Sequence, residues 1–365
     1  MQPALSLMYL VAGLVMLTIG AELLVRGASR LAAAVGVSSL IVGLTVVAFG
    51  TSAPELAVSI RAGLAGQPDI AIGNALGSNV FNVLAILGLS ALVAPLVVSR
   101  QLVLLDVPVL IAVSLFSWML AADGNVSRAD GLVLLSLLAA YTGFLVHSGR
   151  QEMANAAAAV ENENRSAQEK AEPRRLTMNL VLVVAGLALL VSGADLFVGG
   201  AVAIARVLGV TELVIGLTVI AAGTSLPEMA TSVVASMRGE RDIAVGNIVG
   251  SSIFNLLAVM GGAAAVAPAG IAVSDASITF DFPVAIAVAV ACLPVFFTGH
   301  LISRWEGGTF LAYYFAYLTY LFLAATGNAA APAMATAMMY FVLPLTVLTL
   351  GVIAARAWHA GKALS

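Results

Sequence analysis

The stretch Gly50-Thr51-Ser52-Ala53-Pro54-Glu55 recurs 173 positions later (from residue 50 to residue 223) as Gly223-Thr224-Ser225-Leu226-Pro227-Glu228. A longer stretch recurs at the same offset, because Gly73-Asn74-Ala75-Leu76-Gly77-Ser78-Asn79-Val80-Phe81-Asn82 returns as Gly246-Asn247-Ile248-Val249-Gly250-Ser251-Ser252-Ile253-Phe254-Asn255. Each copy of the first stretch places a Glu inside a strongly apolar segment. A charged group in hydrocarbon is costly and is kept where it has a function, so Glu55 and Glu228 mark a functional site.

The composition of the chain is that of a membrane protein. Of its 365 residues 61% are hydrophobic and only 10% are charged, with a mean hydropathy of +1.06, whereas soluble domains carry about a quarter charged residues. The apolar residues come in runs of about 20, the length that crosses a bilayer as an α-helix. We therefore expect an all-α polytopic protein in a lipid bilayer. No basic cluster lies outside the loops, so no nucleic-acid partner is expected.

Eleven apolar runs are predicted to span the membrane. Five form a first half over residues 1–148, a polar linker covers 149–176, and five more form a second half over 177–327. The eleventh run, 335–356, is an extra C-terminal span. The predicted spans are 4–25, 38–62, 70–95, 102–121, 129–148, 177–198, 211–236, 243–267, 277–298, 308–327 and 335–356.

The two halves are predicted to be inverted-topology repeats. Each holds an odd number of spans, so the second half enters the membrane from the opposite side. Lys and Arg collect in cytoplasmic loops, which places the N-terminus outside and the linker and C-terminus in the cytoplasm. With this assignment only Arg61, Arg128 and Arg206 of the 16 Lys and Arg residues lie outside. We expect a multi-pass protein of the plasma (inner) membrane.

Polar residues recur every four positions in four of the predicted helices, so they lie along one face of each helix. Their functional groups are carboxylates, amide carbonyls and hydroxyls, and no His or Cys is among them. Hard cations such as Ca²⁺, and Na⁺ by extension, prefer oxygen ligands, whereas zinc and copper prefer nitrogen and sulfur. The four stripes are Thr51/Glu55/Ser59, Asn74/Ser78/Asn82, Thr224/Glu228/Ser232 and Asn247/Ser251/Asn255.

Pro54 and its copy Pro227 are predicted to break their helices. Proline has no N–H and clashes with the carbonyl four residues earlier in the helix. Carbonyls freed in this way are tolerated in a membrane where they line a cavity or bind an ion. We expect free carbonyls at Val47, Ala48 and Gly50 and, in the second half, at Ile220, Ala221 and Gly223.

Some of these polar residues have a simpler structural explanation. Single Ser residues in membrane helices bond their own helix, and this is expected of Ser59 and Ser232. Asn74 and Asn247 fit a contact between helices as well as they fit a ligand.

The carboxylates divide into two kinds. Glu22 has Arg26 one helical turn away, which predicts a structural ion pair. Neither Glu55 nor Glu228 has a Lys or Arg in its motif, so a structural ion pair does not explain them.

The two repeated stretches resemble the α-repeats of the calcium/cation antiporter superfamily, and among its branches the prokaryotic sodium/calcium exchanger-like proteins. The similarity covers roughly residues 5–327, with motif regions at 43–90 and 216–263. It implies two inverted five-helix halves around a four-helix core, with Na⁺ and Ca²⁺ bound near the middle of the membrane. It also implies alternating access by two sliding gating helices. A transporter of this kind has no enzymatic activity and no cofactor.

Carried over by position, the resemblance implies a set of ion ligands. Exchangers of this superfamily often carry Asp where Asn255 stands, so this chain has two carboxylates in the set instead of three. The eleventh span also departs from the usual ten. The implied ligands are Thr51, Ser52, Glu55, Ser78, Asn82, Thr224, Ser225, Glu228, Ser251 and Asn255, with the backbone carbonyls of Ala48 and Ala221.

Two carboxylates in a cavity of low dielectric carry a charge of −2, which one Ca²⁺, two Na⁺ or two H⁺ would balance. An empty site leaves two like charges uncompensated, which is costly. The empty protein should therefore resist the transition between its outward-open and inward-open states. That resistance distinguishes an exchanger from a channel. We therefore expect an antiporter that exchanges Ca²⁺ for Na⁺. H⁺/Ca²⁺ exchange and K⁺-dependent exchange on the same fold are the alternatives.

Two functions of other classes fit less well. An intramembrane hydrolase needs a base or a catalytic pair, and no His lies at the centre of a predicted span. A structural scaffold would not bury two unpaired Glu side chains.

Overall fold

The computed structural model describes residues 3–163, 173–208, 221–297, 299–338 and 351. The described part is almost entirely helical. Within it, eight helices are long and apolar enough to cross a membrane, or nine if a bent pair counts as one span. The expectation of a polytopic all-α membrane protein is confirmed.

All five spans predicted for the first half coincide with helical segments. Several are continuous helices in which the backbone changes from α-helical to π-helical and back. The segments are α1 (Pro3–Val35), α2 (Ser39–Val42), the π-helix Gly43–Val47, α3 (Ala48–Thr51), α4 (Ala53–Leu64), α5 (Pro68–Val80), the π-helix Phe81–Leu87, α6 (Gly88–Val93), the π-helix Leu102–Asp106, α7 (Val107–Ala121) and α8 (Arg128–Glu163).

The second half contains corresponding segments as far as it is described. The predicted span 211–236 is described from residue 221 onward, and most of 335–356 lies outside the described residues, so the count of eleven spans stays a prediction. The segments are α9 (Pro173–Val207), α11 (Ala221–Gly223), α12 (Leu226–Met237), α13 (Arg241–Phe254), the π-helix Asn255–Met260, α14 (Gly261–Val266), the π-helix Ser277–Asp281, α15 (Phe282–Phe297), α16 (Arg304–Ala325) and α17 (Ala331–Ala337).

The linker begins as helix. The polar segment expected from residue 149 continues α8 without a break to Glu163. Its Ala and Glu residues are strong helix formers, so a polar composition does not end the helix.

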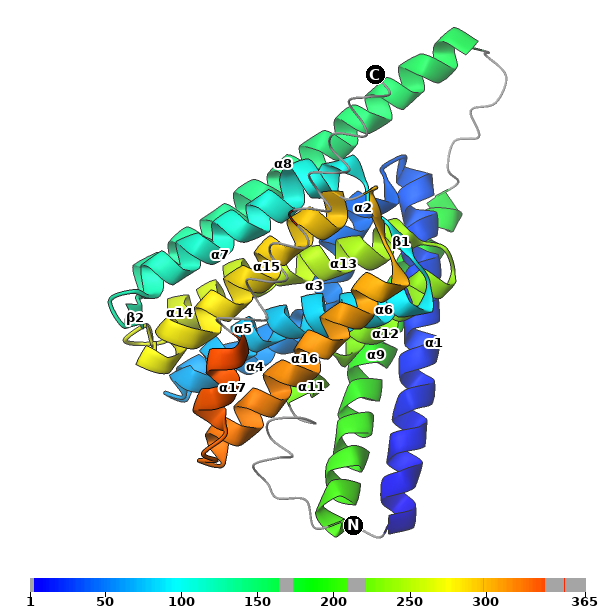
Figure 1. Cartoon of the computed structure of the whole chain (residues 1–365). Coiled ribbons are helices and arrows are strands. Elements are labelled where there is room, and N and C mark those ends of the chain that lie inside the picture. Colours follow the sequence, from blue (N-terminus) through cyan, green and yellow to red (C-terminus); the bar gives the residue numbers. More distant parts are fainter. Residues whose placement is uncertain (1–2, 164–172, 209–220, 298, 339–350, 352–365) are drawn as a thin grey trace.

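Helices α1 and α9 form a closely packed antiparallel pair at one side of the molecule, steeply inclined to the other helices (Figure 1). Glycines spaced seven residues apart make this approach possible. A methyl group on Gly20 would lie 2.8 Å from the carbonyl oxygen of Gly186, and one on Gly193 would lie 3.0 Å from that of Gly13. Small residues let membrane helices meet backbone to backbone.

Two helices lie at the centre of the bundle. In the most apolar window of Arg241–Val266 every residue is buried, and in that of Pro68–Val93 78% are buried, against 6% for Arg304–Ala325. These two central spans carry the longer of the two repeated stretches. The duplicated polar residues are therefore shielded from lipid.

Two short antiparallel ribbons join the halves. Strand β1 (Leu96–Val97) pairs with β4 (Leu301–Ile302), and β2 (Asn125–Val126) pairs with β3 (Ile271–Ala272). The sequence analysis does not predict them, because two residues are too few to produce a strand periodicity.

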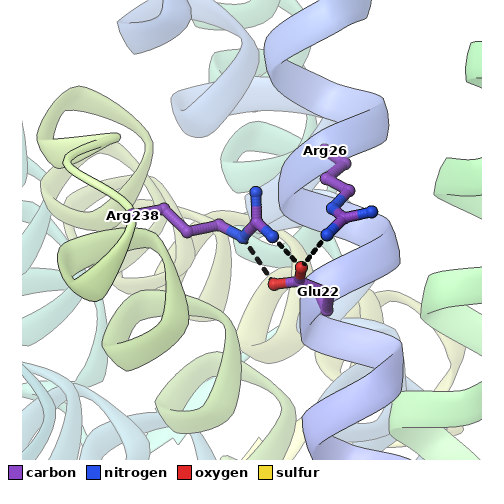
Figure 2. A network of polar contacts seen from close by, with 3 residues as sticks. All are labelled: Glu22, Arg26 and Arg238. Carbon is purple, nitrogen blue, oxygen red and sulfur yellow. Dashed lines mark hydrogen bonds and ion pairs between the residues drawn. The ribbon is translucent and has the colours of Figure 1, made fainter.

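An ion network joins the first helix to the second half (Figure 2). The predicted pair of Glu22 and Arg26 is confirmed, with 2.6 Å between Glu22 Oε1 and an Arg26 guanidinium nitrogen. Arg238, at the end of α12, also binds the Glu22 carboxylate through two of its nitrogens. Nearby, Ser29 Oγ donates to Glu240 Oε1 at 2.6 Å. The loop between α12 and α13 is thus tied to α1.

Candidate ion-binding site

Both helices that carry a duplicated Glu are broken directly before it. In the first half the helix bends by 46° between Ser39–Thr51 and Ala53–Leu64. In the second half α11 ends at Gly223 and α12 begins at Leu226. The prolines stand near the start of α4 and α12, where the absence of an N–H is tolerated. The predicted break is confirmed in both halves.

The two carboxylates are buried and held by serines from the opposite half. Glu55 has 0% of its surface exposed and Glu228 has 1%. Ser225 Oγ donates to Glu55 Oε1 at 2.9 Å, and Ser52 Oγ donates to Glu228 Oε1 at 2.8 Å. Each serine stands three residues before the Glu of its own motif but donates to the Glu of the opposite half. The crossed contacts bring the two motifs together at one place.

One oxygen of each carboxylate has no hydrogen-bond partner in the described part of the chain. Glu55 Oε2 and Glu228 Oε2 are buried and accept no hydrogen bond from the residues that the structure describes. Among the same residues, no Lys or Arg lies within ion-pair distance of either side chain, and the described salt bridges all involve Glu22. A buried carboxylate oxygen without a donor is costly unless a cation compensates it.

Asn74 and Asn247 act as braces between helices. Asn74 Nδ2 donates to the carbonyl oxygen of Glu55 at 3.0 Å and to Ser59 Oγ at 2.9 Å. Its Oδ1 accepts from Thr224 Oγ1 at 3.3 Å. With both ends of its amide bonded, the structure favours the interhelical role over the ligand role for Asn74.

Asn247 makes the corresponding contacts in the second half. Its Nδ2 donates to the carbonyl oxygen of Glu228 at 3.4 Å and to Ser232 Oγ at 3.0 Å, and its Oδ1 lies 3.0 Å from Thr51 Oγ1. The expectation that Ser59 and Ser232 bond their own helices was wrong. Each accepts from an Asn on the neighbouring helix, because the two stripes pack against each other.

Ser78 and Ser251 lie in the buried centre of the same region. Ser225 Oγ lies 3.1 Å from Ser78 Oγ; because the Ser225 proton goes to Glu55, Ser78 is the donor of this pair. Ser251 Oγ approaches the Ala48 carbonyl oxygen at 3.5 Å. Ser78 is 3% exposed and Ser251 is 0% exposed. Ser78 thus lies beside the serine that holds Glu55, and Ser251 lies beside a carbonyl of α3.

The carbonyls expected to be free in the first half are not all free. Thr51 Oγ1 lies 3.1 Å from the Val47 oxygen and 3.4 Å from the Ala48 oxygen, and the Ser52 amide donates to Ala48 at 3.0 Å. The threonine that opens the break thus supplies a donor that the proline argument omits. Ala221 begins α11, and Ile220 lies outside the described residues.

Asn82 and Asn255 are buried at the start of the π-helical segments. Asn82 Nδ2 and Oδ1 and Asn255 Oδ1 have no partner within the described chain. Asn255 Nδ2 donates to Asn79 Oδ1 at 3.2 Å, and Asn79 Nδ2 donates to the Ser252 carbonyl oxygen at 3.0 Å. Asn79 is a further polar residue of this region that the helical spacing of the polar stripes does not include. It lies inside the repeated stretch, and the corresponding residue of the second copy is Ser252. This polar difference between otherwise similar copies is the sequence signal that could have identified it.

Within the described residues, the two carboxylates and the two amides leave four buried oxygens without a donor. They are Glu55 Oε2, Glu228 Oε2, Asn82 Oδ1 and Asn255 Oδ1. A set of carboxylate and amide oxygens, with hydroxyls beside them, suits a hard cation. The residues provide neither the thiolate nor the imidazole that a transition metal prefers.

Comparison with known proteins gives matches over most of the chain. The family described as sodium/calcium exchanger protein matches residues 5–147 and 178–323. The putative antiporter CaxA of Alkalimonas amylolytica is 38% identical over 260 residues, which cover 71% of this chain and 80% of that protein. The sodium/calcium exchanger MaX1 of Methanosarcina acetivorans is 32% identical over 347 residues, which cover 87% of this chain and 98% of that protein.

A solved structure has the same fold. The sodium/calcium exchanger from Methanococcus jannaschii superimposes with a TM-score of 0.72 and 30% sequence identity, covering 87% of this chain and 99% of that chain.

Proposed function

This chain belongs to the sodium/calcium exchanger protein family, and from that premise we propose that it exchanges Ca²⁺ for Na⁺ across a membrane. The chain is a multi-pass membrane transporter and not an enzyme, and the family's transported ions are substrates. Its own coupling ion, its ligands and its mechanism are the content of the proposal.

One observation carries the proposal. Glu55 and Glu228 come from different halves and are buried, and a serine of the opposite half holds one oxygen of each. The other oxygen of each has no hydrogen-bond partner among the described residues. A structural pair of acids would be neutralised by Lys or Arg, and no such partner lies beside them in the described chain. A transported cation is the compensation that remains.

In this proposal the ions bind to the two carboxylates and to the residues around them. The surrounding residues supply uncharged ligands, namely hydroxyl, amide and backbone carbonyl oxygens. The proposed ligands are Thr51, Ser52, Glu55, Ser78, Asn82, Thr224, Ser225, Glu228, Ser251 and Asn255, with the carbonyls of Ala48 and Ala221.

The charge of the site explains coupling. Two carboxylates balance one Ca²⁺ or two Na⁺. When neither is bound, two like charges remain in a region of low dielectric, and this state is costly. The ion-loaded forms therefore pass between the outward-open and inward-open states more readily than the empty form. This couples the transport of Ca²⁺ in one direction to the transport of Na⁺ in the other.

The duplicated sequence supports alternating access. Two inverted five-helix halves, 1–148 and 177–327, can pack against each other in two arrangements of similar energy, one open to each side. We place the N-terminus outside and the linker and C-terminus in the cytoplasm of a cell with this protein in its plasma (inner) membrane, from the distribution of Lys and Arg.

Ion flux tests the proposal. Purified protein in liposomes loaded with Na⁺ should take up radiolabelled Ca²⁺ when diluted into Na⁺-free buffer. Glu55→Gln and Glu228→Gln should each abolish uptake, whereas Asp69→Asn, the same kind of change at an exposed position, should not. Uptake that survives both Gln substitutions would refute the proposed site.

The same liposomes separate the alternatives. A pH gradient in place of the Na⁺ gradient drives uptake if the protein exchanges H⁺ for Ca²⁺. Uptake that needs K⁺ on the Na⁺ side indicates K⁺-dependent exchange. Our proposal expects the Na⁺ gradient alone to suffice.

A further inference from the structure

The two copies of the central motif differ in a polar side chain at one position. The first copy carries Asn79 and the second carries Ser252. Both residues are buried, with 5% and 0% of their surface exposed. Each stands three residues before a proposed ligand, Asn82 or Asn255. The difference therefore lies beside the ion site.

A backbone carbonyl fixes the direction of the Asn79 amide. Asn79 Nδ2 donates to the carbonyl oxygen of Ser252 at 3.0 Å. A carbonyl oxygen can only accept, so the amide must present its nitrogen there and its Oδ1 elsewhere. The orientation of Asn79 thus follows from the main chain of the opposite half.

Asn79 in turn fixes Asn255. Its Oδ1 needs a donor, and Asn255 Nδ2 supplies one at 3.2 Å. The Asn255 amide must then direct its own Oδ1 away from Asn79. That oxygen is buried and accepts no hydrogen bond from any described residue. Two successive bonds, starting from a backbone carbonyl, leave one acceptor oxygen in a set position.

The corresponding amide in the first half is not held in this way. Ser252 Oγ donates to the Ile248 carbonyl of its own helix at 2.9 Å. Both amide atoms of Asn82 are buried without a partner in the described part of the chain. The replacement of Asn by Ser in the second copy accounts for the difference.

We propose that Asn79 is a positioning residue that directs the side-chain oxygen Oδ1 of Asn255 toward the transported cation. Its contact also favours a neutral amide over a carboxylate at position 255. The proposal rests on the function proposed above. An acceptor that is already oriented needs no ordering when the ion binds, which favours binding. A carboxylate at position 255 would set a second acceptor against Asn79 Oδ1. Asn79 thus keeps the fixed charge of the site to that of Glu55 and Glu228.

Calorimetric titration of Ca²⁺ into the full-length protein in detergent tests this role. Asn79→Ser, which copies the residue of the second half, should weaken Ca²⁺ binding about fivefold, the effect of one ordinary hydrogen bond. In an Asn255→Ala background the same change should have no further effect, because the amide on which Asn79 acts is gone. Ser252→Ala is the control and should bind like the wild type, since the Ser252 hydroxyl donates to a carbonyl of its own helix and the backbone carbonyl that holds Asn79 is kept.

A second substitution at position 79 keeps the test valid if the Asn79→Ser variant does not fold. Asn79→Leu keeps the number and branching of the side-chain heavy atoms, removes both bonds, and should show the same dependence on Asn255. Equal losses with and without the Asn255 amide would mean that Asn79 acts through general packing, and the inference would be wrong. Binding unchanged in both Asn79 variants would also overturn it.

The titration distinguishes this failure from that of the proposed function. If the wild type binds no Ca²⁺, or if Glu55→Gln binds it as the wild type does, the proposed function fails and the inference with it. If the wild type binds Ca²⁺ through Glu55 and the Asn79 variants are unchanged, only the inference fails.

Discussion

The crossed serine–glutamate contacts predict an unusual pattern of energetic coupling. Ser225 donates to Glu55, 170 positions away, and Ser52 donates to Glu228, 176 positions away. Each serine is thus coupled to the glutamate of the opposite half and not to the one three residues away in its own motif. Replacing a serine by Ala removes one donor from a buried carboxylate.

The size of the effect follows from the geometry. A hydrogen bond to a charged group contributes about 1.5–3 kcal/mol, and at 2.8–2.9 Å with both partners buried these two bonds are well formed. We expect Ser225→Ala and Ser52→Ala each to lower the free energy of unfolding by about 2 kcal/mol in ion-free buffer. Ser136→Ala removes an exposed serine that bonds its own helix and should change it by less than about 0.5 kcal/mol.

Double-mutant cycles measure the coupling. The protein is unfolded with SDS in mixed micelles, and Trp fluorescence follows the transition in the single and double variants of each Ser and Glu, with Glu changed to Gln. The coupling free energy of Ser225 with Glu55, and of Ser52 with Glu228, should be about 1–2 kcal/mol. The pairs within one motif should couple by less than about 0.5 kcal/mol. Stronger coupling within a motif than across the halves would refute the crossed arrangement.

Three further predictions concern the surroundings of the site. Asn247→Ala leaves a carbonyl and two hydroxyls with fewer partners and should lower the free energy of unfolding by about 2 kcal/mol; unchanged SDS unfolding would contradict the bracing role. Glu22→Gln weakens the ion network with Arg238 and should cost about 1 kcal/mol in low salt and less in high salt, so a salt-independent loss argues against an electrostatic contribution. Gly20→Ala should destabilise the protein by about 1–3 kcal/mol because the added methyl meets backbone, whereas Gly199→Ala, with open space around it, should not; equal melting curves for the two would contradict the close packing of α1 and α9.

Local sequence predicted the membrane class, most spans and the breaks before the two glutamates. These features depend on properties within one segment: a run of about 20 apolar residues, or a proline that removes a hydrogen bond. The importance of Glu55 and Glu228 followed from their position in apolar runs, and the structure places both in one buried region. The sequence also predicted the pair of Glu22 and Arg26, because a four-residue spacing fixes neighbours on a helix.

Contacts between distant segments were not predictable in the same way. The sequence showed no reason for Arg238 to reach Glu22 or for Asn79 to orient Asn255, since these pairs are 216 and 176 positions apart. The same limit explains the error over Ser59 and Ser232, whose partners lie on a neighbouring helix. It also explains the carbonyls of Val47 and Ala48, which the Thr51 hydroxyl approaches through a side-chain rotamer that no sequence pattern specifies.

The sequence by itself determined that two acids lie in apolar surroundings, because hydrophobicity and periodicity act along the chain. Only the tertiary structure decided that each acid is held by the other half's serine. It also decided that the Asn255 amide donates to Asn79, whereas the Asn82 amide has no partner among the described residues. Hydrogen-bond direction depends on where both partners lie in space, and that is set by the packing of helices rather than by the order of residues.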